Sequence, residues 1–142
     1  MKLKILVFDQ EQSLRELLRT LLAAQGHEVL AYRDPAICPI YSNLQDGWCC
    51  CPQERPCADA VLIDMRMPSI GALDFLKLQR RRGCKALDAN KAVMSASMTR
   101  ALEEAIREFG CHHIKKPFHL GEIKSWINEC AGRLAAKRLP PP

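Results

Sequence analysis

The chain has 142 residues, 48% of them hydrophobic and 26% charged, and a formal net charge of +5. This length is most simply one domain, large enough to bury a core without disulfides or metals. The sequence contains no run of about 18 apolar residues, and charge comes too early in the N-terminal segment MKLKILVFDQ for a signal-peptide core. We therefore expect a cytoplasmic protein with reduced thiols and no membrane contact. The charge is modest and no nucleic-acid motif is present, so we expect no direct DNA binding.

The first part of the chain predicts a strand, a helix and a second strand. Apolar segments over residues 3–8 and 28–31 predict the two strands. The apolar residues between them recur at helical spacing and share one face: Leu14, Leu17, Leu18, Leu21 and Leu22. Ser13 and Glu16 match a capping box at the start of this helix, and Gly26 ends it.

The rest of the chain repeats this alternation. A short helix is predicted near residues 35–43, before a loop rich in Gly, Cys and Pro. Three further strands are predicted, over residues 60–63, 92–95 and 113–115. Helical patterns end near Arg82 and Gly110, and the last one runs to Leu134. Because each crossover between parallel strands needs a helix, the predicted fold is α/β, a five-stranded parallel doubly wound sheet in a single domain.

Polar residues follow the predicted strands at the edge where doubly wound sheets carry their reactive sites. They are Asp9, Gln10 and Glu11 after the first strand, Asp64 after the third, Ser95 at the end of the fourth and Lys116 after the fifth. Carboxylates suit Mg²⁺, which uses one or two of them and leaves room for a phosphoryl oxygen. A lysine and a hydroxyl can neutralise and orient that phosphoryl group. Each residue alone has an ordinary structural role, so the interpretation depends on the set.

Four motifs in this order, ILVFDQE, VLIDMRMP, VMSA and IKKPF, resemble the receiver domain of bacterial two-component response regulators. The resemblance covers residues 1–136, with a Cys-rich insertion at 38–58, and leaves a basic, Pro-rich tail at 137–142. It implies the flavodoxin-like receiver fold and a phosphoacceptor signalling domain whose only enzymatic steps are its own phosphorylation and dephosphorylation. The implied partners are a sensor histidine kinase or histidine phosphotransfer protein and an unidentified downstream protein. Few residues follow the last helix, so we expect output through protein contacts.

Carried onto this sequence, the resemblance assigns roles to individual residues. Asp64 would be the phosphoacceptor, Lys116 would pair with the phosphoryl group, and Ser95 would hydrogen-bond it. Asp9, Asp64 and the backbone carbonyl of Arg66 would hold Mg²⁺. IKKPF matches the cis-proline turn of the family, which would aim Lys116 at the site.

The sequence departs from the family at two other positions. The family usually has a second acid where this chain has Gln10, so Mg²⁺ affinity should fall unless Gln10 or Glu11 supplies an oxygen. This departure favours an alternative, a phosphorylation-independent pseudo-receiver that acts as an interaction module. His113 stands near the aromatic switch position, where it either rotates together with Ser95 or is an edge histidine without a switching role.

Five cysteines fall within twenty residues of the predicted insertion: Cys38, Cys49, Cys50, Cys51 and Cys57. In a cytosolic chain this density suggests a metal more than disulfides, with Zn²⁺ favoured over an iron–sulfur cluster, although the usual CxxC pairs are absent. A redox-reactive thiol set, which would make the chain a thiol or metal sensor, and inert loop cysteines remain alternatives. Cys84, Cys111 and Cys130 are isolated, and we expect them to be ordinary small apolar residues, with Cys130 in the core.

Overall fold

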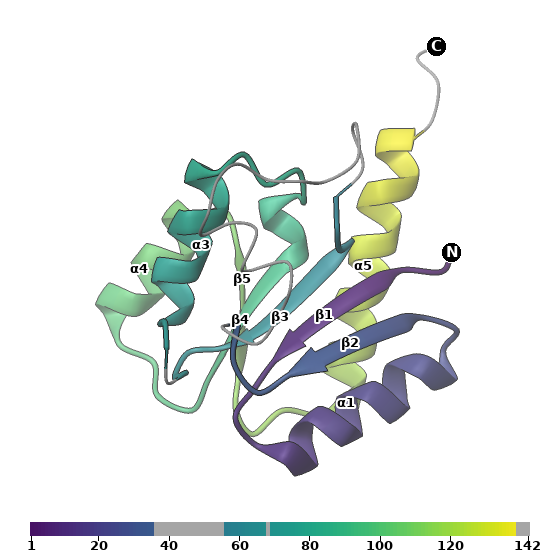
Figure 1. Ribbon diagram of the computed structural model, residues 1–142, viewed down its shortest axis with the longest axis horizontal. Coiled ribbons are helices and arrows are strands. Elements are labelled where there is room, and N and C mark those ends of the chain that lie inside the picture. The colour runs from purple at the N-terminus through teal and green to yellow at the C-terminus, as the bar shows by residue number, and fades with distance from the viewer. Residues whose placement is uncertain (36–55, 68, 139–142) are drawn as a thin grey trace.

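The computed structural model describes residues 1–35, 56–67 and 69–138. Its strands are β1 (Lys4–Phe8), β2 (Glu28–Tyr32), β3 (Ala60–Asp64), β4 (Lys91–Ser95) and β5 (His112–Lys115). Its helices are α1 (Gln12–Ala24), α3 (Ala72–Arg81), α4 (Arg100–Glu108) and α5 (Leu120–Arg138), with a short 3₁₀ helix, η2 (Asp88–Asn90), before β4. The strands form one parallel sheet in the order β2-β1-β3-β4-β5 (Figure 1). The predicted fold is therefore confirmed, with each strand within one residue of its predicted ends.

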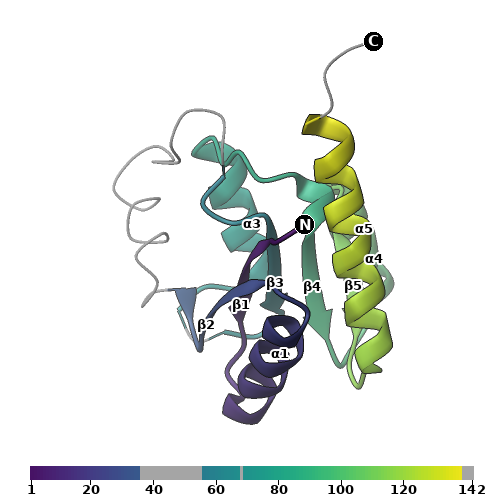
Figure 2. The ribbon, with the colours of Figure 1, turned by 90° about the vertical axis from the view of Figure 1, so that its right-hand side faces the viewer.

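Helices cover both faces of the sheet (Figures 1 and 2). Successive strand residues point to opposite faces, so alternate residues of β1 enter two different cores. Ile5 and Val7 pack with α1 and α5, and Leu6 and Phe8 pack with α3 and α4. Burial on both faces explains why the central strands β1, β3 and β4 have continuous apolar runs rather than alternating patterns.

The carboxyl ends of the central strands meet at one edge, and backbone hydrogen bonds continue past them. The N–H of Asp9 donates to the carbonyl of Tyr32 at 3.1 Å, and the N–H of Lys116 donates to the carbonyl of Ser95 at 2.8 Å. Similarly, Met65, directly after Asp64, donates to Met94 at 2.8 Å. The residues that follow three strands are thus fixed by the sheet itself.

The helix ends differ from the prediction in two places. Helix α1 begins at Gln12 and its N-cap residue is Glu11, which makes no side-chain capping bond, so the predicted capping box was wrong. Instead, the Ser13 hydroxyl donates to the Glu11 carboxylate at 3.0 Å. Helix α5 continues to Arg138, two residues into the predicted tail.

The short helix predicted near 35–43 lies almost entirely outside the described residues. Among the helices that are described, none has the length and apolar character needed to cross a membrane.

Candidate functional site

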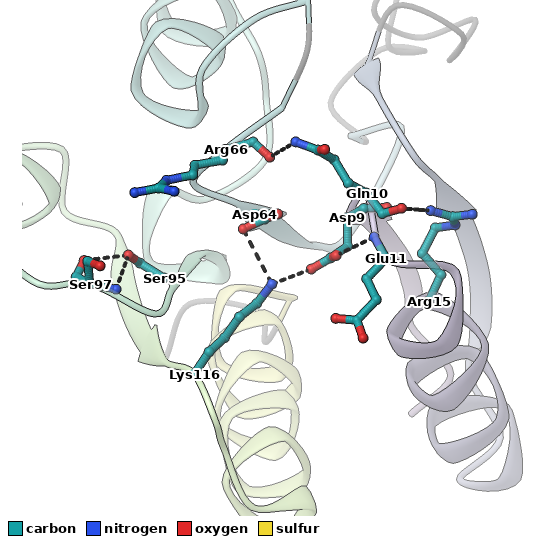
Figure 3. A network of polar contacts seen from close by, with 9 residues as sticks. All are labelled: Asp9, Gln10, Glu11, Arg15, Asp64, Arg66, Ser95, Ser97 and Lys116. Carbon is teal, nitrogen blue, oxygen red and sulfur yellow. Dashed lines mark hydrogen bonds and ion pairs between the residues drawn. The ribbon is translucent and has the colours of Figure 1, made fainter.

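Lys116 joins the two acids at the carboxyl edge of the sheet. Its Nζ atom lies 2.7 Å from Asp9 Oδ2 and 3.3 Å from Asp64 Oδ1 (Figure 3). The Asp9 side chain is 1% exposed, whereas those of Asp64 and Lys116 are 16% and 19% exposed. The structure thus brings together three residues from the ends of β1, β3 and β5, and only Asp64 and Lys116 retain access to solvent.

The surrounding backbone holds this group in place. Asp9 Oδ1 accepts a hydrogen bond from the N–H of Glu11 at 2.9 Å, so both carboxylate oxygens of Asp9 have donors. The Lys116–Pro117 peptide bond is cis, as the IKKPF motif predicts. The buried acid is therefore fully partnered, which is the usual condition for a charge inside a protein.

Burial and charge alter the ionisation of the group. Burial raises the pKa of Asp64 above its ordinary value, the Asp9 carboxylate raises it further, and Lys116 offsets this only in part. Burial alone would lower the pKa of Lys116, but the hydrogen bond and charge of Asp9, aided by Asp64, raise it above its ordinary value. Asp9 has the larger effect on the pKa of Lys116 because the ammonium lies closer to Asp9 than to Asp64.

Gln10, which follows β1, connects to the loop after β3 beside Asp9, Asp64 and Lys116. Its Nε2 atom donates to the backbone carbonyl of Arg66 at 2.5 Å, between residues that are 56 positions apart in the sequence (Figure 3). Arg15 secures the other side of the same turn, because its guanidinium donates to the carbonyls of Asp9 at 2.6 Å and Gln10 at 2.9 Å. The Gln10 amide therefore donates to the same carbonyl that the family resemblance assigns to Mg²⁺.

The oxygens present fit Mg²⁺ in kind. Two carboxylates, Asp9 and Asp64, and the Arg66 carbonyl are hard donors of the type this ion prefers. All three residues are at present engaged by donors of the chain, through Lys116 and Gln10. Within the described residues, no three His, Cys, Asp or Glu side chains are arranged to hold a metal. A cation would therefore bind through two side chains and a backbone oxygen, in competition with these two donors.

Ser95 and Glu11 point away from Asp64. The Ser95 hydroxyl donates to the carbonyl of Ser97 at 2.5 Å and accepts from its N–H at 3.2 Å (Figure 3). The Glu11 carboxylate accepts from Ser13, and its contribution to the site is its backbone N–H. Contact between Ser95 and a group on Asp64 would require its hydroxyl to leave Ser97.

His113 lies on β5 next to α4. It pairs with Val93 of β4, and its Nε2 atom is buried without a hydrogen-bond partner. Burial lowers the pKa of His113, and the neighbouring His112 lowers it further. The lowered pKa favours the neutral form of His113. Nothing in this arrangement shows rotation of the side chain, so its switching role stays a prediction.

Two pockets adjoin Lys116. The smaller, about 140 Å³, opens beside the acid pair, and its lining residues are Asp64, Met65, Arg66, Ser95, Ala96, Ser97 and Lys116. The larger, about 420 Å³, is mostly apolar and lies between α1 and the start of α5; its lining residues are Glu11, Leu14, Leu17, Ala96, Lys116, Pro117, Phe118 and Leu120. Since Ala96 and Lys116 line both, the two pockets adjoin each other.

The structure adds one residue pair that sequence reasoning missed. Asp34, which is 5% exposed, accepts hydrogen bonds from both the N–H and the hydroxyl of Ser69. This contact ties the segment after β2 to the loop after β3 that carries Arg66. No sequence motif marks the pair, because the two residues lie 35 positions apart.

Most of the predicted Cys-rich site lies outside the described residues. Cys38, Cys49, Cys50 and Cys51 fall in the undescribed segment, and Cys57 is half-buried just before β3. The metal site proposed for these cysteines therefore stays a prediction. Cys130 is fully buried in the core, as expected.

Comparison with known proteins identifies the fold. No protein-family model matches the chain, and no curated protein matches its sequence. The chemotaxis protein CheY4 of Vibrio cholerae is 16% identical, with a TM-score of 0.69 over 92% of this chain and 99% of that chain. The receiver domain of a Francisella response regulator is 18% identical, with a TM-score of 0.73 over 94% and 99% of the two chains.

A third solved structure contains a metal. It is the receiver domain of a sensor histidine kinase from Pseudomonas aeruginosa, with a magnesium ion coordinated in its active site cleft. That domain is 17% identical, with a TM-score of 0.69 over 93% of this chain and 99% of that chain. The chain described here therefore has the fold of response regulator receiver domains.

Proposed function

We propose that this protein is a receiver domain that accepts a phosphoryl group on Asp64 and signals through protein contacts. The observation that carries the proposal is the Lys116 ammonium held between Asp9 and Asp64 at the carboxyl edge of the sheet. This arrangement places a partly exposed carboxylate nucleophile, a cation and a small pocket together, and phosphoryl transfer needs mainly such positioning and neutralisation of charge.

The residues of the chain have distinct tasks in this reaction. An Asp64 oxygen forms a bond to the phosphorus while the bond from phosphorus to the histidine nitrogen of the donor breaks. Lys116 neutralises the incoming phosphoryl oxygens, and Ser95 donates its hydroxyl to one of them after leaving Ser97. Mg²⁺, held by Asp9, Asp64 and the Arg66 carbonyl, would supply further positive charge when bound.

The donor is proposed to be a sensor histidine kinase or a histidine phosphotransfer protein. The apolar pocket between α1 and α5 supports a protein donor, because Leu17 and Leu120 are 44% and 39% exposed at its rim. A protein seated there would bring its phosphohistidine next to Lys116, which lines both pockets. The downstream partner is a further, unidentified protein.

A second function, an interaction module that works without phosphorylation, is favoured by one observation. The Gln10 amide donates to the Arg66 carbonyl and brings no negative charge where a second acid would help to hold a cation. If this contact persists, metal binding and phosphorylation are weak, and partner binding alone regulates the protein.

Intact-mass measurement separates the two functions. The purified full chain is incubated with Mg²⁺ and a small-molecule phosphoryl donor, and its mass is compared with that of Asp64→Asn. We expect the wild type to gain one phosphoryl group and Asp64→Asn to gain none. Asp74→Asn, a change at an exposed residue of α3, is the matched control and should gain one. A folded wild type that gains nothing supports the interaction module, and wild-type labelling of Asp64→Asn rejects Asp64 as the acceptor.

A further inference from the structure

A lysine and a cysteine are in contact at the amino end of β4, the opposite edge of the sheet from Asp64. The Lys91 side chain is 1% exposed, and its Nζ atom donates to Cys84 Sγ at 3.7 Å. Its other described partner is Asp88, whose Oδ1 atom lies 3.4 Å from Nζ. A buried ammonium held by one carboxylate is thus directed at a thiol.

The backbone fixes both members of this pair. Cys84 follows α3, and its N–H donates to the carbonyl of Gln79 at 2.8 Å, with Gly83 at a φ of 77° making the turn. Lys91 is the first residue of β4 and pairs with Val61 of β3. The contact is therefore set by a helix end and a central strand, not by two mobile side chains.

Cys84 has surroundings that favour reaction with an oxidant. Thiols next to a cation and partly open to solvent are the reactive ones, and Cys84 is half-buried beside Lys91. Burial raises the pKa of Cys111 to about 11 and that of Cys130 to about 12, so both stay protonated.

We propose that Cys84 and Lys91 are an oxidant-sensitive pair that a peroxide converts into a covalent sulfur–nitrogen cross-link. In the first step the Cys84 sulfur attacks the peroxide, the O–O bond breaks, and sulfenic acid and one water form. The sulfur loses two electrons and the peroxide gains them. In the second step Lys91, after passing a proton to Asp88 or to solvent, attacks the sulfur. The N–S bond forms, the S–O bond breaks, and a second water leaves.

The cross-link changes the charge beneath α3 and α4. It removes the positive charge of Lys91 and leaves Asp88 with Arg80, whose guanidinium lies 3.1 Å away. A thiol reductant reverses the change by taking the sulfur back to the thiol. The pair lies four residues along β4 from Ser95, about 13 Å, so this inference does not rest on phosphorylation of Asp64.

Tryptic mapping of the full chain tests the proposal. Reduced protein is treated with hydrogen peroxide, remaining thiols are alkylated, and the protein is digested without reduction. We expect peptide 83–85 joined to peptide 86–100 with two hydrogen atoms fewer than their sum, and no cleavage after Lys91. Thiol reduction before digestion should separate the peptides and restore that cleavage. Because this readout uses the wild type, it does not depend on any variant folding.

Variants sharpen the test. Cys84→Ser and Lys91→Met should abolish the joined peptide, whereas Lys85→Arg and Cys111→Ser, changes at a neighbouring lysine and a nearby thiol, should retain it. Recovery of Cys84 only as sulfinic or sulfonic acid, or in a disulfide, with normal cleavage after Lys91 overturns the proposal. Formation of the joined peptide at wild-type yield in Lys91→Met also overturns it.

Discussion

The Gln10 amide donates a hydrogen bond to the Arg66 carbonyl, one of three oxygens expected to hold Mg²⁺. The amide N–H takes up one of the two lone pairs of this carbonyl and draws on its negative partial charge, so the hydrogen bond competes with a cation for the oxygen. The absence of a carboxylate at position 10 and the hydrogen bond on the Arg66 carbonyl both lower the affinity for Mg²⁺. Both predict weak binding of Mg²⁺ by the wild type.

Gln10→Asp should therefore bind Mg²⁺ at least about tenfold more tightly, because it adds a carboxylate and removes the donor from Arg66. Isothermal titration calorimetry with MgCl₂ measures the change. Gln12→Asp is the matched control, since it adds the same charge at the exposed start of α1. Equal affinities for the two variants would show that charge at position 10 does not reach the ion.

Asp64 links the site to the stability of the fold. Its pKa is raised by burial and by Asp9, so the folded chain holds this proton more tightly than the unfolded chain. Protonated Asp64 stabilises the fold at pH values below the ordinary pKa of aspartate. This contribution is lost as the pH rises through the raised pKa of the folded state. At neutral pH, ionised Asp64 therefore destabilises the fold relative to a neutral side chain.

Asp64→Asn should accordingly raise the thermal midpoint at pH 7 by a few degrees. The difference from the wild type should shrink as pH falls through the raised pKa of Asp64. Circular dichroism melts between pH 4 and 8 measure this, with Asp74→Asn as the exposed control. A lower midpoint for Asp64→Asn at pH 7 would mean that the bond to Lys116 outweighs the burial of the charge.

The sequence predicts which residues meet at the site wherever a strand end fixes their position. Asp9, Asp64 and Lys116 follow strands of one parallel sheet, so their meeting follows from the topology. The side-chain directions of Gln10 and Ser95 were not predictable. They depend on the approach of loops distant in sequence, as with Gln10 and Arg66, or on a local turn, as with Ser95 and Ser97.

At the scale of elements, the loop after β3 depends on a contact from the end of β2. Asp34 accepts two hydrogen bonds from Ser69 and is nearly buried, so Asp34→Ala removes both bonds and the packing of the carboxylate. Asp34→Ala should destabilise the protein by about 1–3 kcal/mol. Urea unfolding measures the change, with Asp74→Ala expected to stay within about 0.5 kcal/mol of the wild type. Equal effects of the two changes would show that the Asp34–Ser69 contact does not stabilise the loop.

The elements themselves were predictable where the apolar pattern was strong. Leu18 and Leu22, on the predicted apolar face of α1, are fully buried, and Gly26 ends that region with a φ of 91°. The capping box was wrong because Ser13 lies inside the helix and its hydroxyl bonds Glu11 instead. Local side-chain competition of this kind is invisible in a motif match.

At the scale of the whole molecule, alternation of strands and helices was sufficient to predict the sheet. The three central strands, β1, β3 and β4, are buried on both faces, and a parallel sheet covered by helices accommodates such strands. The Cys-rich segment at 38–58 gives no such constraint, because cysteine spacing alone does not decide between metal and thiol chemistry. Its metal site therefore remains a prediction from composition.

The central claim is that Asp64 receives the phosphoryl group, and residue-level trapping tests it most directly. Protein labelled by a phosphoryl donor is reduced with borohydride, which converts a phosphorylated aspartate to homoserine, and is then mapped by mass spectrometry. We predict homoserine at position 64 and unmodified aspartate at Asp9 and Asp59. Homoserine at Asp9 or Asp59, or labelling without any at position 64, would contradict the assignment.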